Sequence, residues 1–292
     1  MIFIYLLVLF LLFVHFYLPR FIMEIKNPLI VLLREEKQRD HFDVSEKVGK
    51  KLFFKSFDGL KMAAHITYAV PGKVKGTIIL LHGIRSKKES YVYLSKRLAK
   101  LGFNSVALDL RAHGQSEGTH CTFGVKEKKD IVSLIDYLNQ SEKIKNNIGI
   151  WGRSLGGAVA LQSMAIDKRL EFGIVESTFS NFRTITHDYF EIILGFRFEL
   201  FSSYLASRAE SIADFKNATP INSAKDITQP ILIIHGAEDE KVNISYGKAN
   251  YENLKSTQKE FIAVEKAEHM NVWEVGGEPL FSQILEFIHK AK

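Results

Sequence analysis

The chain has 292 residues, 46% of them hydrophobic and 25% charged, which is enough for one large core or two small ones. Its net charge of +6 comes from scattered basic residues such as Lys87 and Lys88, which we expect on the solvated surface, and no basic and aromatic cluster suggests a nucleic-acid partner. The single cysteine, Cys121, excludes an intrachain disulfide and is typical of a reducing compartment, and no metal-binding or phosphate-binding motif points to a metal or cofactor.

Residues 1–18 form an apolar run that is interrupted only by His15. At the rise of an α-helix the run is just long enough to cross the hydrocarbon core of a bilayer, so it predicts an uncleaved transmembrane anchor. A secretory signal peptide would need a basic segment before the run and small residues after it, and both are missing. A signal peptide and a buried helix remain as alternatives.

Residues 19–50 mix apolar and charged side chains and predict a juxtamembrane linker helix. This helix could lie on the membrane surface or pack on the body, and the sequence favours neither. Basic residues follow the apolar run at Arg20, Lys26, Arg34, Lys37 and Arg39. Because such residues stay on the cytoplasmic side, we expect a single-pass membrane protein with the rest of the chain in the cytoplasm.

Strand and helix patterns alternate through residues 51–292, which we expect to form one domain. A hairpin is predicted over 51–69 with its turn at Asp58 and Gly59, followed by strands at 76–83, 104–110, 147–152, 170–177, 230–236 and 259–265. Helical patterns occur at 89–102, 125–140, 155–166 and 278–291. This alternation predicts an α/β fold with a mostly parallel sheet and helices on both faces. Ligands of such sheets bind at the carboxyl ends of the strands.

A serine follows one of these strands within a glycine-rich turn. Residues 152–156 read Gly-Arg-Ser-Leu-Gly, the G-x-S-x-G pattern, between a predicted strand and a predicted helix. In a nucleophile elbow the serine occupies a strained turn that holds its hydroxyl clear of the sheet. The pattern therefore makes Ser154 the candidate nucleophile.

A serine needs a base and an acid to become nucleophilic, and two later strand ends supply them. Asp239 follows the strand at 230–236 and His269 follows the strand at 259–265. The chain order Ser, Asp, His is the order that G-x-S-x-G hydrolases use. Glu238 and Glu240 flank the aspartate and remain as alternatives for the acid.

From about residue 51 to the end, the chain resembles the α/β-hydrolase superfamily, and more narrowly its serine-aminopeptidase and monoacylglycerol-lipase-like branch. The resemblance lies in the segments LLHGIRS, DLRAHGQSEG, GRSLGGAVAL, IIHGAEDEKV and AEHMN. It implies that the backbone N–H groups of Ile84 and Leu155 form an oxyanion hole. It also implies that the apolar insertion at about 181–220 is a short helical cap over the serine, although plain packing on the sheet would explain its aromatic residues as well.

Other polar residues near strand ends have more ordinary explanations. We expect structural hydrogen bonds from His82 and His235. The resemblance suggests a buried salt bridge for Arg111 and a capping role for His113. Glu176 is expected to be a packing or supporting residue, and Cys121 is expected to pack in the core.

The sequence therefore predicts a serine hydrolase that cleaves carboxylic esters or thioesters of small acyl or lipid-like substrates through an acyl-enzyme. An aminopeptidase of the same fold is one alternative, with Asp188 and Glu191 as the acids that would hold a substrate ammonium. A binding protein without catalysis is another. Dehalogenase and epoxide hydrolase chemistry is disfavoured, because those enzymes have Asp in place of Ser154. The partners expected are the substrate and, through the N-terminal helix, a membrane, whereas oligomeric state is left open.

Overall fold

The computed structural model describes residues 1–19, 48–70, 74–144, 147–195, 198–213 and 215–291. Its strands are β1 (Gly49–Lys55), β2 (Lys61–Thr67), β3 (Gly76–Leu81), β4 (Phe103–Leu108), β5 (Ile148–Arg153), β6 (Leu170–Glu176), β7 (Ile231–Gly236) and β8 (Lys259–Val264). Its α-helices are α1 (Ile2–Leu12), α4 (Val92–Lys100), α5 (Glu127–Ser141), α6 (Leu155–Ile166), α7 (Phe182–Leu194), α8 (Glu199–Ala213), α9 (Pro220–Ala224), α10 (Ile244–Asn253) and α11 (Val272–Lys290). Shorter helical turns are η1 (Phe13–Tyr17), η2 (Lys88–Tyr91) and η3 (Phe215–Asn217).

The eight strands form one sheet in the order β1-β2-β4-β3-β5-β6-β7-β8. The hairpin of β1 and β2 pairs antiparallel with β4, and all neighbours from β4 to β8 are parallel. The parallel strands β3, β5 and β7 are buried throughout or nearly so, as expected for strands that are covered on both faces. Their carboxyl ends meet at one edge of the sheet.

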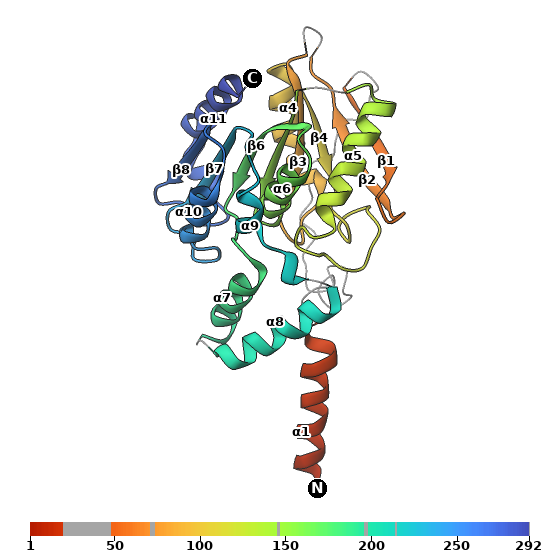
Figure 1. Cartoon of the computed structure of the whole chain (residues 1–292), viewed down its shortest axis with the longest axis vertical. Coiled ribbons are helices and arrows are strands. Elements are labelled where there is room, and N and C mark those ends of the chain that lie inside the picture. Colours follow the sequence, from red (N-terminus) through yellow and green to blue (C-terminus); the bar gives the residue numbers. More distant parts are fainter. Residues whose placement is uncertain (20–47, 71–73, 145–146, 196–197, 214, 292) are drawn as a thin grey trace.

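Two apolar layers flank this sheet, one on each face (Figure 1). Because side chains alternate along a strand, Ile79 of β3 packs with α5 and α6, whereas Ile78 packs with α4 and α11. β5 and α6 therefore lie at the centre of the body, and the turn between them is held by both layers.

The predicted α/β-hydrolase fold with its mostly parallel sheet is confirmed, and so is the hairpin turn at Asp58 and Gly59. The insertion predicted at 181–220 contains α7 and α8, which extend away from the sheet (Figure 1). The final helix predicted at 278–291 is present as the longer part of α11, and a shorter helical segment precedes it from Val272, separated by the non-helical dihedral angles of Gly277. Helix α10 was not anticipated, because its polar sequence has no clear apolar period.

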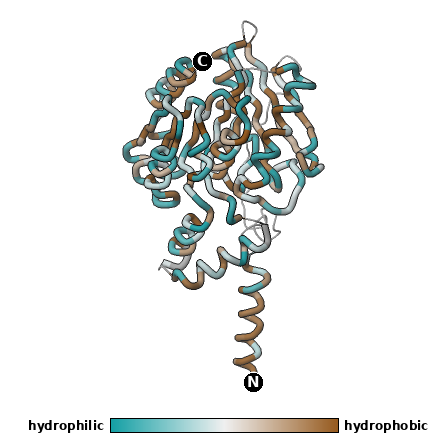
Figure 2. The backbone as a smooth tube through the Cα atoms, in the orientation of Figure 1, coloured by the Kyte–Doolittle hydropathy of each residue, from teal (hydrophilic) through white to brown (hydrophobic). Residues whose placement is uncertain are grey.

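The transmembrane anchor predicted for residues 1–18 is not supported. Helix α1 ends at Leu12 and continues as the π-helical turn η1, and none of the helices in the described ranges is long and apolar enough to cross a membrane. The segment is nevertheless apolar and extends away from the body (Figure 2). The linker helix predicted at 19–50 falls mostly on residues 20–47, which lie outside the described residues.

Candidate active site

Ser154 lies on a tight turn between β5 and α6, as the G-x-S-x-G pattern predicts. Its φ of 54° is in the left-handed region, which is strained for a serine. Gly152 and Gly156 are required because neighbouring backbone leaves no room for a Cβ at either position. A Cβ on Gly152 would lie 2.1 Å from the carbonyl oxygen of Gly156, and a Cβ on Gly156 would lie 2.0 Å from that of Leu81.

A chain of hydrogen bonds links Ser154 to a buried carboxylate. His269 Nε2 lies 3.2 Å from Ser154 Oγ, and His269 Nδ1 lies 2.7 Å from Asp239 Oδ2. Asp239 is buried, whereas the flanking Glu238 and Glu240 are exposed. Of the three candidate acids, Asp239 is therefore the one that contacts the imidazole.

The environment of Asp239 keeps its carboxylate ionised. Burial alone would raise its pKa, but hydrogen bonds with His235 and His269, together with the charge of His269, hold the pKa well below its usual range. The backbone N–H groups of Lys241 and Val242 also donate to Oδ1, at 3.0 and 2.8 Å. An ionised Asp239 can fix the imidazole tautomer with its proton on Nδ1, which leaves Nε2 free to accept a proton from Ser154.

The two predicted oxyanion donors flank the serine. Leu155 is the first residue of α6, where the backbone N–H has no acceptor within the helix. Ile84 follows Gly83, where a Cβ would lie 3.5 Å from Ser154 Cβ. Within the described ranges, neither N–H donates to another protein group. Both N–H groups thus lack a protein acceptor in this part of the structure, as the donors of an oxyanion hole must.

The loop that carries Ile84 is fixed by buried polar groups. His113 Nε2 accepts a hydrogen bond from the Arg85 N–H at 3.1 Å, and its Nδ1 donates to the Arg111 carbonyl at 2.9 Å. Burial, followed by the charge of nearby His82, lowers the pKa of His113 to about 3. The neutral imidazole therefore works as a fixed acceptor beneath the loop.

Lys88, which we expected on the surface, is 2% exposed and anchors the same loop. Its Nζ forms a salt bridge of 2.6 Å with Asp109 Oδ2, and its backbone N–H donates to Asp109 Oδ1 at 2.8 Å. The prediction was wrong because its acidic partner lies 21 positions further along the chain, at the end of β4. Ion pairing then makes burial of a lysine possible.

The remaining polar residues have structural partners, as predicted. Arg111 forms salt bridges with Asp130 and Asp58, at 2.6 and 3.2 Å. His235 Nε2 donates to the Val242 carbonyl at 2.7 Å, which supports the turn that carries Asp239. Cys121 is fully buried in the core.

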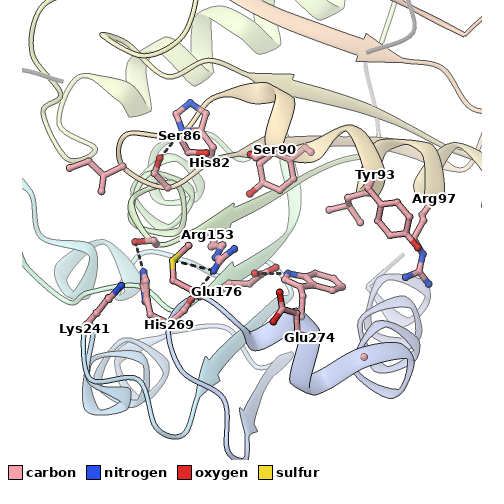
Figure 3. Close-up of a pocket in the computed structure, with 18 of the residues that line it drawn as sticks. His82, Ser86, Ser90, Tyr93, Arg97, Arg153, Glu176, Lys241, His269 and Glu274 are labelled. Atoms are coloured by element: carbon pink, nitrogen blue, oxygen red, sulfur yellow. Dashed lines mark hydrogen bonds between the residues drawn. The ribbon is translucent and has the colours of Figure 1, made fainter. Parts of the chain in front are cut away.

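A cavity of about 650 Å³ opens beside Ser154 (Figure 3). Its walls come mainly from the loop after β3 with η2 and α4, and from the loop after β8 with the start of α11. Aromatic side chains from these walls are Tyr91, Tyr93 and Trp273. Among the described residues of α7 and α8, Tyr189 alone lines it. The cavity can therefore hold an acyl or alcohol group next to the nucleophile.

The strand next to the one that leads to Ser154 ends in a buried carboxylate whose contacts the sequence did not reveal. Glu176, at the end of β6, accepts hydrogen bonds from the indole N–H groups of Trp151 and Trp273, the latter at 3.0 Å. Trp273 follows His269 by four residues, so this contact ties the histidine loop to the sheet. We had expected Glu176 to be a supporting residue, and it is one.

The central parallel sheet and the serine on the turn between β5 and α6 define a class of enzymes. The chain belongs to the α/β-hydrolase superfamily and is a hydrolase of that fold. The family model described as "Serine aminopeptidase, S33" matches residues 72–193.

Individual relatives agree with this class. The alpha/beta hydrolase domain-containing protein WAV2 of Arabidopsis thaliana is 27% identical, over 83% of this chain and 79% of that protein. The structure of the Pyrococcus furiosus esterase Pf2001 is similar at a TM-score of 0.70 and 25% identity, over 87% of this chain and 97% of the esterase. The lysophosphatidylserine lipase ABHD12 of Danio rerio is 30% identical, over 60% of this chain and 46% of that protein.

Proposed function

We propose that the chain is a serine hydrolase that cleaves carboxylic ester or thioester bonds through an acyl-enzyme on Ser154. The observation that carries the proposal is the pair of contacts that His269 makes. Its Nε2 lies 3.2 Å from Ser154 Oγ, and its Nδ1 lies 2.7 Å from Asp239 Oδ2. Similarity to an esterase and to a lysophospholipid lipase supports the same class of reaction.

Each residue has a defined part in this reaction. Ser154 Oγ attacks the acyl carbonyl while His269 Nε2 accepts its proton. The N–H groups of Ile84 and Leu155 then stabilise the oxyanion of the tetrahedral intermediate, and Asp239 stabilises the imidazolium. His269 passes the proton to the leaving alcohol or thiol, and afterwards activates the water that releases the acid.

The aminopeptidase alternative gains no support from the positions of its acids. Asp188 accepts a hydrogen bond from the Tyr246 hydroxyl, and neither Asp188 nor Glu191 belongs to the described residues that line the cavity. A substrate ammonium bound beside Ser154 would therefore not reach them without rearrangement of α7.

Labelling with a fluorophosphonate probe and hydrolysis of short 4-nitrophenyl esters test this proposal. We expect Ser154→Ala to lose both while its melting temperature stays near that of the wild type.

Asp239→Asn should lower kcat by about four orders of magnitude, because the imidazole takes the wrong tautomer. Glu238→Gln is the matched control and should stay within a few-fold of wild type. Labelling that persists in Ser154→Ala contradicts the nucleophile, and an inactive Glu238→Gln contradicts the acid.

A further inference from the structure

Two basic residues of the cavity have no carboxylate partner among the described residues. By contrast, Arg97 in the same cavity forms a salt bridge with an acidic residue, as do three arginines outside it, namely Arg111, Arg169 and Arg183. Arg153 and Lys241 both line the cavity beside Ser154, and neither forms a salt bridge with a described residue. Their positive charges thus remain available to a ligand.

Arg153 is held in place by the backbone rather than by an acid. Its Nη2 donates to the His269 carbonyl oxygen at 2.8 Å and lies 3.8 Å from Met270 Sδ. A guanidinium has five N–H groups, and those on Nε and Nη1 have no hydrogen-bond partner among the described residues. Figure 3 shows the guanidinium inside the cavity, close to His269. The side chain is therefore positioned in advance and keeps donors for a further contact.

Glu176, the buried acid in this part of the cavity, forms no ion pair with Arg153. The two oxygens of Glu176 each accept an indole N–H, from Trp151 and Trp273, and neither lies within salt-bridge distance of the guanidinium. Burial raises the pKa of Glu176, and the positive charge of Arg153 partly opposes this rise, so the two groups interact without forming an ion pair. At the other end of the cavity Glu278 is already paired with Arg97, at 2.6 Å.

We propose that Arg153 and Lys241 form a subsite for an anionic group of the substrate, a carboxylate or a phosphate, beside the acyl group on Ser154. The planar fork of an arginine binds either group through two parallel hydrogen bonds, and Lys241 adds a second positive charge. The inference rests on the proposed esterase function and narrows its substrates to esters that carry a negative charge close to the scissile bond.

Two matched pairs of esters test the subsite on the full chain. The first compares 4-nitrophenyl hydrogen glutarate with 4-nitrophenyl pentanoate, and places a carboxylate on the acyl side. The second compares 1-butyrylglycerol 3-phosphate with 1-butyrylglycerol, and places a phosphate on the alcohol side. We expect the wild type to prefer the anionic member of at least one pair by about tenfold or more in kcat/KM. The pair that shows the preference identifies the side on which the anion binds.

The variants Arg153→Met and Lys241→Met then assign the preference to these residues. Arg153→Met should lower the anionic-to-neutral ratio to near one, and Lys241→Met should lower it less, because Lys241 is exposed. Arg97→Met is the matched control from the same cavity and should leave the ratio unchanged, because its charge is already paired. The ratio is the readout because loss of the Arg153 contact to the His269 carbonyl can slow both members of a pair.

The outcomes separate the two proposals. If the wild type hydrolyses the neutral esters but shows no preference for either anion, or keeps its preference in Arg153→Met, the subsite is wrong and the esterase proposal stands. If it hydrolyses no member of either pair and Ser154 takes no fluorophosphonate, the proposed function is wrong and the subsite falls with it.

Discussion

Protonation of His113 at Nε2 would remove its hydrogen bond with the Arg85 N–H. In the unfolded chain its pKa is near 6.5, whereas burial lowers the pKa to about 3 in the folded protein. Between these values the unfolded state binds the extra proton, so stability rises with pH across the window and is lost as pH falls below about 6.5. At pH 5 the expected loss from this residue is about 2 kcal/mol.

His113→Gln tests this contribution, because the Gln side chain oxygen can replace Nε2 as acceptor for the Arg85 N–H without titrating. The measurement is the free energy of unfolding in urea at pH 7.5 and pH 5 for both proteins. The wild type should lose about 2 kcal/mol more than the variant between the two pH values. Equal losses would mean that His113 is protonated in the folded protein.

The candidate triad could be predicted at this scale because each member follows a strand, and strand ends of a parallel sheet converge. The contacts of Arg153 and Lys88 could not be predicted from the sequence. The charge of a residue is visible in the sequence, but its partner is set by the fold, and Lys88 meets Asp109 only when two neighbouring strands align. For Arg153, the indication of a role at the site was its position next to Ser154 in the sequence, and the sequence analysis did not use it.

Among the described glycines, Gly156 in the turn between β5 and α6 leaves the least room for a Cβ beside neighbouring backbone. Gly156→Ala would place a Cβ 2.0 Å from the Leu81 carbonyl oxygen, which is backbone of β3 and cannot move aside. We expect a loss of more than about 4 kcal/mol, or failure to fold. Gly59→Ala is the matched control, because that position has a φ of 87° but no atom within 4 Å of the added Cβ.

Melting temperatures of the two glycine variants provide the comparison. Gly59→Ala should cost about 1 kcal/mol, from its left-handed backbone alone. If Gly156→Ala melts as high as Gly59→Ala, then α6 can shift away from β3, and the turn is less rigid than its contacts suggest.

Most elements could be predicted from apolar periodicity, but their ends could not. The last helix was predicted at 278–291, and the structure adds a short helical segment before it that begins at Val272. Gly277 has non-helical dihedral angles and separates the two segments. Val272 packs in the layer with α4, a contact that the sequence does not reveal, so the preceding segment could not be predicted.

The large apolar side chains of helix α1, from Ile2 to Leu12, are all exposed. Described contacts of this N-terminal segment follow the helix, where Val14 is buried and His15 forms a hydrogen bond with Tyr204 of α8. An exposed apolar surface of this size favours association. Full-length protein should therefore self-associate more than a chain that starts at residue 19.

Deleting residues 1–18 should leave the hydrolase body intact. The hydrogen bond of His15 and the burial of Val14 are together worth about 3 kcal/mol, so their loss lowers the melting temperature by no more than about 10 °C. Sedimentation velocity without detergent compares association of the two chains, and hydrolysis of a short 4-nitrophenyl ester compares their activity. A large drop in melting temperature would mean that this segment belongs to the folding unit.

The cavity is built almost entirely by the body, and α7 and α8 add only Tyr189 among their described residues. The insertion is nevertheless anchored in the core, where Phe182 and Ile185 of α7 and Ala209 of α8 are buried. Its outer part can therefore change in sequence without disturbing the turn that carries Ser154. A graft of α7 and α8 from a relative that keeps these three core side chains is then a practical way to alter access to Ser154.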